Sequence, residues 1–223
     1  MIKKVTILPI GSTEYHGGHL PLETDWLIAK ALSERIKEQL TDSIKVFLLP
    51  IIKKAPLSAS KLSPGSVYET PQKLIKNILK AAKNCNTDKL FLLSGHWGGT
   101  MKSTLTLAAL EVYNKYKIDV YIVDIFSAIP LDKMEQRYFG HADELETSMI
   151  LYLHPEKVKA IYKKHKFIPP QKKTKHIHYL FAKDSEWHIS YWGEPALATK
   201  KKGEIIVKTM VESLANAIQE CTK

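Results

Sequence analysis

One short segment of the sequence is dense in side chains that can bind metal ions. Between positions 14 and 25 the chain carries three carboxylates and two imidazoles, which are Glu14, His16, His19, Glu23 and Asp25. Carboxylate oxygens and imidazole nitrogens together suit Zn²⁺, Mn²⁺ or Fe²⁺. A site with two such ions can polarise a carbonyl group and generate hydroxide at neutral pH. The segment therefore indicates metal-assisted hydrolysis.

A further histidine, His96, opens a glycine-rich turn at 95–100 directly after an apolar run at 89–94. In the pattern Glu14-x-His16, a spacing of two in an extended loop can point both side chains the same way. Asp25 has two oxygens and could bridge two ions. We therefore expect Glu14, His16, Asp25 and His96 to be the ligands of one or two divalent ions per chain.

Each of these residues also has a simpler interpretation. Asp25 stands at the predicted start of a helix and could serve only as a cap. A histidine after a strand is often structural, and the turn at 95–100 could be a tight connection or an anion-binding cradle. The turn lacks the Gly-Lys-Ser/Thr ending of a Walker motif. Four candidate ligands delivered by the ends of two strands favour the metal site.

The elements that must position these residues alternate along the chain. Apolar runs predict buried strands at 5–10, 45–52, 89–94 and 119–126. Helical spacing of apolar residues predicts helices at 25–40, at 71–84 after the cap Thr70, and after residue 100 to about 116. This alternation predicts an α/β fold with a parallel sheet covered on both faces. Ligands in such folds bind at the carboxyl ends of the strands.

Beyond residue 126 the pattern is less regular. We expect a short helix at 131–138, a helix from 141 to about 153, a strand at 186–192 and a turn at 193–199. A last amphipathic helix is predicted from 203 or 204 to 221. The basic stretch 157–184 is left without an assignment. We expect a single domain that spans residues 1–223.

The chain is basic, with 33 lysines and arginines against 23 acids and a net charge of +10. Only Arg35 and Arg137 are arginines, the residue type that reads phosphates and bases in two-pronged contacts. The lysines are interspersed with acids, which indicates a solvated surface more than a nucleic-acid interface. The exception is 157–175, with eight lysines. This segment could attract a phosphorylated substrate or could equally be solvated surface.

No apolar stretch approaches about 18 residues, so no membrane-spanning helix is expected. The first residues lead into a strand and lack the apolar core of a signal peptide. Cys85 and Cys221 lie far apart without metal-binding spacing, which fits a reducing compartment. We therefore expect a cytoplasmic protein.

Three motifs carry a family resemblance. Gly-Ser-Thr-Glu-Tyr-His-Gly-Gly-His-Leu-Pro-Leu-Glu-Thr-Asp at 11–25 closely resembles the signature of the creatininase (creatinine amidohydrolase) family. Ser-Gly-His-Trp-Gly-Gly-Thr at 94–100 and His-Ala-Asp-Glu-Leu-Glu-Thr-Ser at 141–148 resemble its second and third motifs. The segments 63–66 and 193–199 are similar to smaller landmarks. The matches follow the family order from residue 8 to about 204.

The resemblance implies a three-layer α/β/α fold, often hexameric, with a mono- or binuclear metal centre that hydrolyses a C–N bond of a small-molecule amide. Glu14, His16, Asp25 and His96 match the family's metal ligands, with Asp25 as the bridge. His141 matches a histidine proposed for proton transfer. Glu146 matches an acidic residue at the same active-site mouth. His19 and Glu23 are expected to hold the loop.

One position departs from the pattern. Family members that act on creatinine carry a glutamate ligand two residues after the second-motif histidine, and here that position is Gly98. A second ion would then depend on Glu144, Glu146 or water. The glycine form resembles members that deformylate a ribosylaminopyrimidine phosphate in flavin and deazaflavin synthesis, and members linked to peptide maturation. We therefore favour another amide, such as the formamide, over creatinine.

Two alternatives stay open at this point. The chain could be a creatinine amidohydrolase proper despite Gly98. It could also be a basic protein that binds nucleotide or RNA and carries a vestigial metal site, which the net charge and the glycine-rich turn would support.

Overall fold

The sheet is the centre of the fold. The structure is a computed structural model, and it describes residues 2–40, 44–57, 64–98, 100–136, 140–166 and 191–222. Within these residues four strands form a parallel sheet in the order β2-β1-β3-β4. The strands are β1 (Lys3–Ile10), β2 (Ile44–Leu48), β3 (Lys89–Ser94) and β4 (Asp119–Val123). The predicted parallel α/β fold is confirmed.

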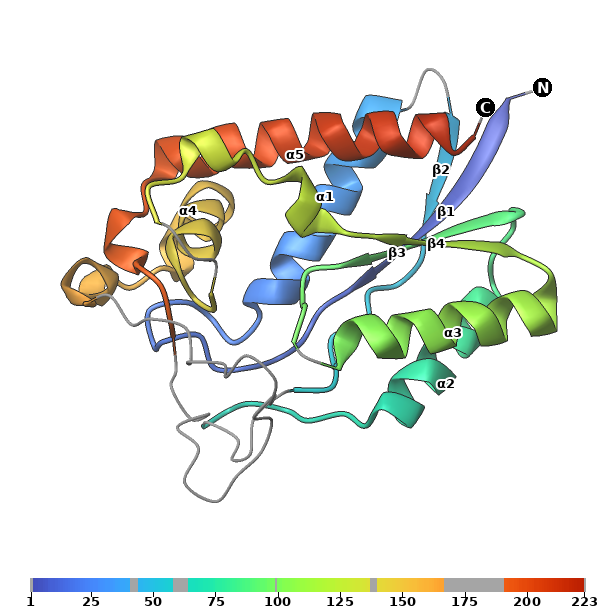
Figure 1. Cartoon of the computed structure of the whole chain (residues 1–223), viewed down its shortest axis with the longest axis horizontal. Helices are drawn as coiled ribbons and strands as arrows, with labels where there is room; N and C mark the ends of the chain where they lie inside the picture. Colours follow the sequence, from blue (N-terminus) through green and yellow to red (C-terminus); the bar gives the residue numbers. More distant parts are fainter. Residues whose placement is uncertain are drawn as a thin grey trace, which may run out of the picture.

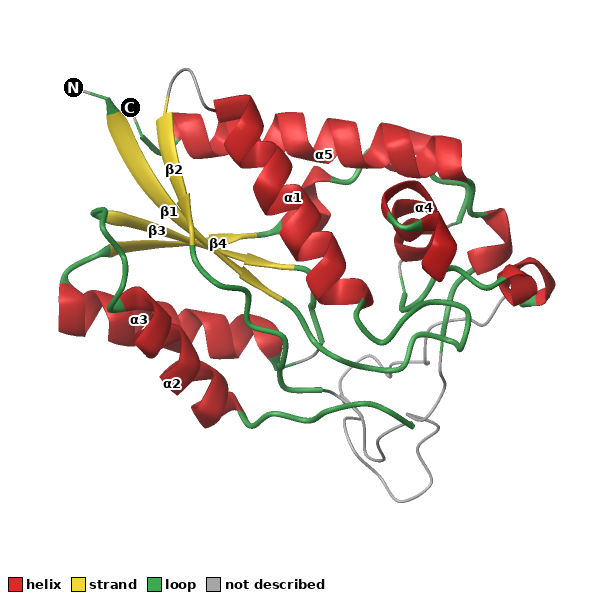
Figure 2. Cartoon of the chain, turned by 180° about the vertical axis from the view of Figure 1, so that it is seen from behind, coloured by secondary structure: helices red, strands yellow, loops and turns green. Residues whose placement is uncertain are grey.

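Helices cover both faces of this sheet, which gives three layers (Figure 1, Figure 2). On one face lie α1 (Thr24–Leu40), α4 (Glu144–Leu153) and α5 (Lys200–Glu220). On the other face lie α2 (Pro71–Ala82) and α3 (Met101–Tyr116). Short 3-10 helices complete the described elements: η1 (Ile125–Ala128), η2 (Leu131–Lys133), η3 (Pro155–Lys157), η4 (Ala160–Lys164) and η5 (Pro195–Leu197).

The strands separate two hydrophobic cores because successive side chains of a strand point to opposite faces. In β1, Val5 and Ile7 belong to the core under α1 and α5, whereas Leu8 and Ile10 belong to the core over α2 and α3. Burying each such side chain contributes about 1.5–3 kcal/mol. The continuous apolar run of β1 is therefore explained by burial on both of its faces.

The register of the central strands brings two loops together at the carboxyl edge. Ile10, the last residue of β1, is paired with Ser94, the last residue of β3. The N–H of Gly95 then donates to the Ile10 carbonyl at 2.9 Å. A Cβ on Gly95 would lie 2.1 Å from the carbonyl oxygen of Asp25. Only glycine therefore lets the turn after β3 approach the first turn of α1.

Two predicted strands end earlier than expected. The run 45–52 is a strand only to Leu48, because Pro50 cannot donate to a sheet, and Ile52 makes a single bridge to Ile10. The run 119–126 is a strand only to Val123. There the Asp124 carboxylate accepts the Phe126 N–H and starts the 3-10 turn η1. The prediction that positions 49–52 and 124–126 continue these strands was wrong.

The predicted helix at 131–138 was also wrong in its extent. Only Leu131–Lys133 forms a 3-10 turn, and positions 137–138 lie outside the described residues. The helix predicted from 141 begins at Glu144, because Asp143 adopts an extended backbone and caps it. The helix predicted from 203 begins at Lys200, because the Thr199 hydroxyl accepts the Lys202 N–H.

Parts of the sequence predictions fall outside the described residues. These are positions 186–190 of the predicted strand and positions 167–175 of the basic segment. Trp192, at the end of that predicted strand, makes an isolated antiparallel bridge with His141. No described helix is long and apolar enough to span a membrane. The extent of the predicted domain, residues 1–223, stays a prediction.

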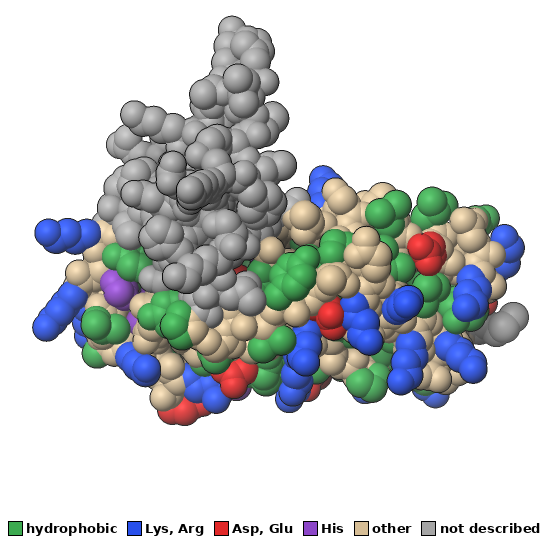
Figure 3. Space-filling view, turned by 90° about the horizontal axis from the view of Figure 1, so that it is seen from below, with side chains coloured by type: hydrophobic (Ala, Val, Ile, Leu, Met, Phe, Trp, Pro, Cys, Tyr) green, Lys and Arg blue, Asp and Glu red, His purple; other side chains and the backbone are tan. Residues whose placement is uncertain are grey.

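The surface charge is mixed over the face shown in Figure 3. Lysine and arginine side chains are spread along this face, and acidic side chains lie among them. Among the described residues on this face, the distribution agrees with a solvated surface more than with one basic binding patch.

Candidate metal centre

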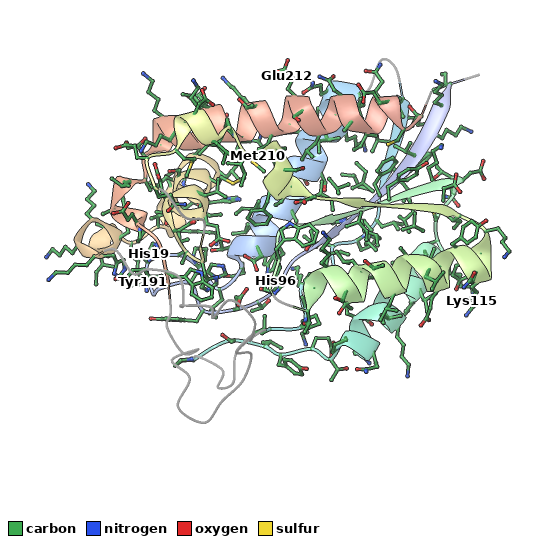
Figure 4. The ribbon with its side chains drawn as sticks, in the orientation of Figure 1. His19, His96, Lys115, Tyr191, Met210 and Glu212 are labelled. Carbon is green, nitrogen blue, oxygen red and sulfur yellow. The ribbon has the colours of Figure 1, made fainter. Side chains whose placement is uncertain are left out.

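The predicted ligands meet at the carboxyl edge of the sheet. Glu14 and His16 lie in the loop after β1, Asp25 lies in the first turn of α1, and His96 follows β3. In Figure 4, His96 stands near the ends of α1 and α3 that face this edge. The start of α4 brings His141 and Glu146 to the same place. The structure thus brings together all six residues that the sequence singled out for chemistry.

The first group of donors surrounds one nitrogen of His96. Its Nδ1 lies 2.8 Å from Glu14 Oε1 and 3.0 Å from Asp25 Oδ2. The other ring nitrogen, Nε2, donates to the carbonyl of Pro56 at 3.1 Å. That contact orients the ring and leaves Nδ1 for the carboxylates, the usual arrangement behind a metal-binding histidine.

The second group surrounds one nitrogen of His16. Its Nε2 lies 3.0 Å from Asp25 Oδ1 and 3.7 Å from Glu146 Oε2. Its Nδ1 donates to the carbonyl of Glu14 at 2.9 Å, which fixes the ring. The two oxygens of Asp25 therefore face two different histidines. This is the orientation that a bridging carboxylate requires.

A third group contains His141. Glu14, His16 and His141 each offer a ligand atom, and these atoms lie within 4.8 Å of one another. The ring centroids of His16 and His141 lie 4.3 Å apart. His141 Nε2 donates to the carbonyl of Tyr15 at 2.8 Å, so Nδ1 is the ring nitrogen left for chemistry. His141 thus borders both Glu14 and His16.

The donor set fits a divalent cation. An ion with tetrahedral bonds of about 2.0–2.1 Å places its ligand atoms roughly 3.3 Å apart. The nitrogen–oxygen separations around His96 and His16 run from 2.8 to 3.7 Å and bracket that value. Among the described residues, the three groups Glu14–Asp25–His96, His16–Asp25–Glu146 and Glu14–His16–His141 are those that could hold an ion.

The protonation of the two facing histidines follows from the carboxylates. Burial disfavours the charged form of His16, but the charge and hydrogen bond of Asp25 outweigh burial and raise its pKa to about 10. Burial likewise opposes the charged form of His96, yet Glu14 and Asp25 raise its pKa well above the usual value. Without an ion, a proton therefore lies between each ring and its carboxylates, where a cation would lie.

The carboxylates at this edge differ in the direction in which their pKa values are shifted. Burial opposes ionisation of Asp25, but His16 and His96 hold its pKa well below the usual value. Burial raises the pKa of Glu146 to about 8, despite the opposing charge of His16. Burial, followed by the charge of His16, lowers the pKa of His141. His141 is therefore mainly neutral near pH 7 and able to accept a proton.

Ser12 belongs to the candidate centre, although no sequence motif predicted it. Its Oγ lies 2.6 Å from Asp25 Oδ2 and 2.9 Å from Glu14 Oε1. Such a hydroxyl holds carboxylates in place behind a metal ion. Its position two residues before Glu14 was the only available signal, because a serine in a loop has many ordinary uses.

The two glutamates at the start of α4 point to different places. Glu144 accepts the N–H groups of Glu135 and Gln136 and pairs with Lys202 Nζ at 2.5 Å, away from the centre. Glu146 instead faces His16. The sequence left open which of the two reaches the centre, and the structure places Glu146 there.

His19 lies beside the centre and outside the three groups. Its Nε2 is 2.9 Å from the Thr147 hydroxyl of α4, and its carbonyl accepts the Lys159 N–H. Figure 4 shows it close to Tyr191. It thus ties the loop after β1 to α4, which agrees with the expected structural role.

A family model described as creatininase, creatinine amidohydrolase, matches residues 2–218. The chain belongs to the creatininase family. The creatinine amidohydrolase of Pseudomonas putida is 21% identical over 245 residues, which cover 97% of this chain and 89% of that enzyme. The mycofactocin precursor peptide peptidase of Mycolicibacterium smegmatis is 27% identical over 159 residues, 69% of this chain. That match spans only 60% of the peptidase.

Solved creatininase structures share the fold. A candidate creatinine amidohydrolase from Bacteroides fragilis NCTC 9343 superposes with a TM-score of 0.80 at 24% identity, and covers 100% of this chain and 91% of that one. A structure described as creatininase Mn gives a TM-score of 0.79 at 19% identity, with 99% and 91% coverage. The α/β/α fold expected from the resemblance is therefore confirmed, and the chain is a member of a hydrolase family.

Proposed function

We propose that this creatininase-family chain is a metal-dependent amidohydrolase that cleaves a C–N bond in a small-molecule amide or formamide. The observation that carries the proposal is the position of Asp25, whose two oxygens lie 3.0 Å from His16 Nε2 and 3.0 Å from His96 Nδ1. Carboxylate and imidazole donors of this kind suit Zn²⁺, Mn²⁺ or Fe²⁺. Related solved structures described as creatininase Mn and as creatininase of Zn-Zn type support the choice of metal.

In this proposal Glu14, Asp25 and His96 hold one ion, and His16 lies on the other side of Asp25. A bound divalent ion supplies an activated water and polarises the carbonyl group of the amide. Ser12 keeps the Glu14 and Asp25 carboxylates in position. Pro56 and the Glu14 carbonyl hold the two histidine rings in the tautomers that leave a nitrogen facing the carboxylates.

His141 is the residue we assign to proton transfer. Its Nε2–H is engaged by the Tyr15 carbonyl, so a proton must move through Nδ1. Its lowered pKa keeps it neutral near pH 7, and a neutral imidazole can accept a proton and return it to the leaving nitrogen. Glu146, the acidic residue proposed for the same active-site mouth, lies 3.7 Å from His16 Nε2, and a cation bound beside it would favour its ionised form.

The substrate we favour is not creatinine, because Gly98 lacks the glutamate carried at this position by the family members that hydrolyse creatinine. Likeness to a peptide peptidase gives a second candidate, a peptide amide. A phosphorylated formamide is a third, and the lysines before residue 167 would favour its approach. We further propose a cytoplasmic homo-oligomer, a hexamer by family resemblance.

A hydrolysis panel tests the proposal. The metal-free protein is loaded separately with Zn²⁺, Mn²⁺ and Fe²⁺, and assayed on creatinine, on a formylaminopyrimidine nucleotide with and without its phosphate, and on short peptides. We expect turnover of at least one non-creatinine amide, lost on chelation and restored by metal. Rapid turnover of creatinine would contradict the substrate preference. No metal-dependent hydrolysis together with salt-sensitive RNA binding would favour the binding-protein alternative.

A further inference from the structure

The candidate centre has no carboxylate at Gly98, but the fold brings the carboxylate of Glu146 to the centre from α4. Gly98, after β3, has no side chain where the creatinine-hydrolysing members carry a metal-binding glutamate. We propose that Glu146 of α4 replaces it, so that His16, Asp25 and Glu146 form a complete site for a second divalent ion. This inference rests on the proposed function, because it extends the same centre from one ion to two.

The geometry of the three residues fits one ion. Their ligand atoms lie within 4.8 Å of one another, and all three side chains are buried. His16 Nε2 stands 3.0 Å from Asp25 Oδ1 and 3.7 Å from Glu146 Oε2, so the imidazole nitrogen faces two oxygens from two different helices. Asp25 contributes its other oxygen to the group that contains Glu14 and His96. Two ions would therefore share this one carboxylate.

Local structure at the start of α4 points Glu146 toward this site. Ala142 has a φ of +51°, a left-handed conformation that is uncommon for a residue with a Cβ. In this conformation its N–H donates to Glu146 Oε2 at 2.6 Å. The Asp143 side chain caps the helix and accepts the Glu146 N–H. The backbone strain thus coincides with the positioning of a single carboxylate.

The surroundings of Glu146 favour a cation as its partner. Its side chain also lines a small cavity with Ile28, Phe126, Met149 and Met210, and the remaining residues that line this cavity are also apolar or glycine. An ionised carboxylate against apolar side chains is costly unless a positive charge lies beside it. An ion held by His16 and Asp25 would supply that charge. Glu144, by comparison, already has Lys202 as its partner.

A purely structural role is the competing explanation. An acid at the third position of a helix, reaching back toward the N–H groups before it, resembles a capping box. That role would affect the stability of the protein and leave its metal content unchanged. The two explanations are therefore separated by counting ions rather than by measuring activity.

The experiment titrates metal-free wild-type protein, Glu146→Gln and the control Glu144→Gln with Mn²⁺. Bound ions per chain are measured by elemental analysis, and electron paramagnetic resonance reports coupling between paired ions. We expect two coupled ions in the wild type and in Glu144→Gln, and one uncoupled ion in Glu146→Gln with the second affinity lowered at least about 100-fold. The double variant Gly98→Glu, Glu146→Gln should regain the second ion.

The remaining outcomes distinguish failure of the second ion site from failure of the proposed hydrolase function. Two coupled ions in Glu146→Gln would overturn the inference, and so would a wild type that binds one ion, even if the variant failed to fold. In the latter case metal-dependent hydrolysis by the wild type would leave the proposed function standing. A wild type that binds no ion would overturn both.

Discussion

Asp25 Oδ2 lies 3.0 Å from His96 Nδ1, although 71 positions separate the two residues in the chain. The contact exists because β1 and β3 are paired at the centre of the sheet and end side by side. Gly95 then lets the turn after β3 pass against the backbone of Asp25. The centre is thus held by the core of the fold, and changes in the core should alter it.

Replacing Gly95 tests this dependence. Gly95→Ala places a Cβ 2.1 Å from the Asp25 carbonyl oxygen, so α1 and the turn must separate. We expect a loss of about 1–3 kcal/mol in the free energy of unfolding, together with weaker metal binding. The matched control is Ala109→Gly, at a half-buried position in the interior of α3, where glycine costs about 1 kcal/mol without a change at the centre. Equal metal affinities in the two variants, both folded, would argue against the dependence.

Ser12→Ala should weaken metal binding without removing a ligand. The hydroxyl contacts both Glu14 and Asp25, and loss of such an orienting group typically lowers metal affinity about 10–100-fold. Calorimetric titration with Zn²⁺ or Mn²⁺ measures this change. Ser33→Ala is the control, because Ser33 is also buried and its hydroxyl has no hydrogen-bond partner among the described residues. A similar change in metal affinity in both variants would show that Ser12 does not orient the two carboxylates.

His141→Asn should separate catalysis from metal binding. If His141 moves the proton, kcat should fall about 10²–10⁴-fold while the bound metal is retained. The rising limb of the pH–rate profile should also disappear, because the wild-type limb reports deprotonation of this histidine. The control His154→Asn replaces a partly exposed histidine paired with Glu156, and it should leave kcat and the bound metal unchanged. Loss of an ion from His141→Asn would instead identify His141 as a ligand.

The metal-free protein should lose stability as the pH rises. The pKa of His16 is raised from 6.5 to about 10, so its contribution is fully present below about 6.5 and is lost as the pH passes through 10. The pKa of Glu146 is raised from 4.5 to about 8, so its contribution is lost as the pH rises through 8. Urea unfolding of chelator-treated protein should give a lower free energy at pH 9 than at pH 6.5.

His16→Gln is the control for that pH dependence, since it removes the group with the higher raised pKa. Its free energy of unfolding should vary less between pH 6.5 and 9 than that of the metal-free wild type. A metal-free wild type with constant stability over this range would show that His16 does not hold its proton through Asp25.

The clustering of the candidate ligands could be predicted from the sequence better than the positions of the side chains around them. Glu14, His16, Asp25 and His96 stand directly at strand and helix ends, where chain order alone determines that they share an edge. The approach of Glu146 to His16 depends on how α4 packs against α1 and α5, which no local pattern encodes. Ser12 carries no distinctive spacing.

The predicted element boundaries were wrong where a single capping side chain starts a helix within an apolar or polar run. Asp124 stops β4 in the middle of an apolar stretch by capping η1. Thr199 starts α5 three residues before Gly203, among lysines that resemble a loop. Asp143 moves the start of α4 beyond His141, which leaves that histidine in extended backbone paired with Trp192.

The role of Asp25 as the carboxylate shared by both donor groups is measured by comparing wild-type protein with Asp25→Asn. Both are loaded with metal, freed of excess ions by gel filtration, and analysed for bound metal and for hydrolysis of the amide that the wild type turns over fastest. Because Asp25 joins both donor groups, we predict that the variant retains little metal and loses about 10³-fold in kcat/KM. An Asp25→Asn protein that keeps its ions and hydrolyses the amide like the wild type would show that Asp25 does not hold the metal centre together.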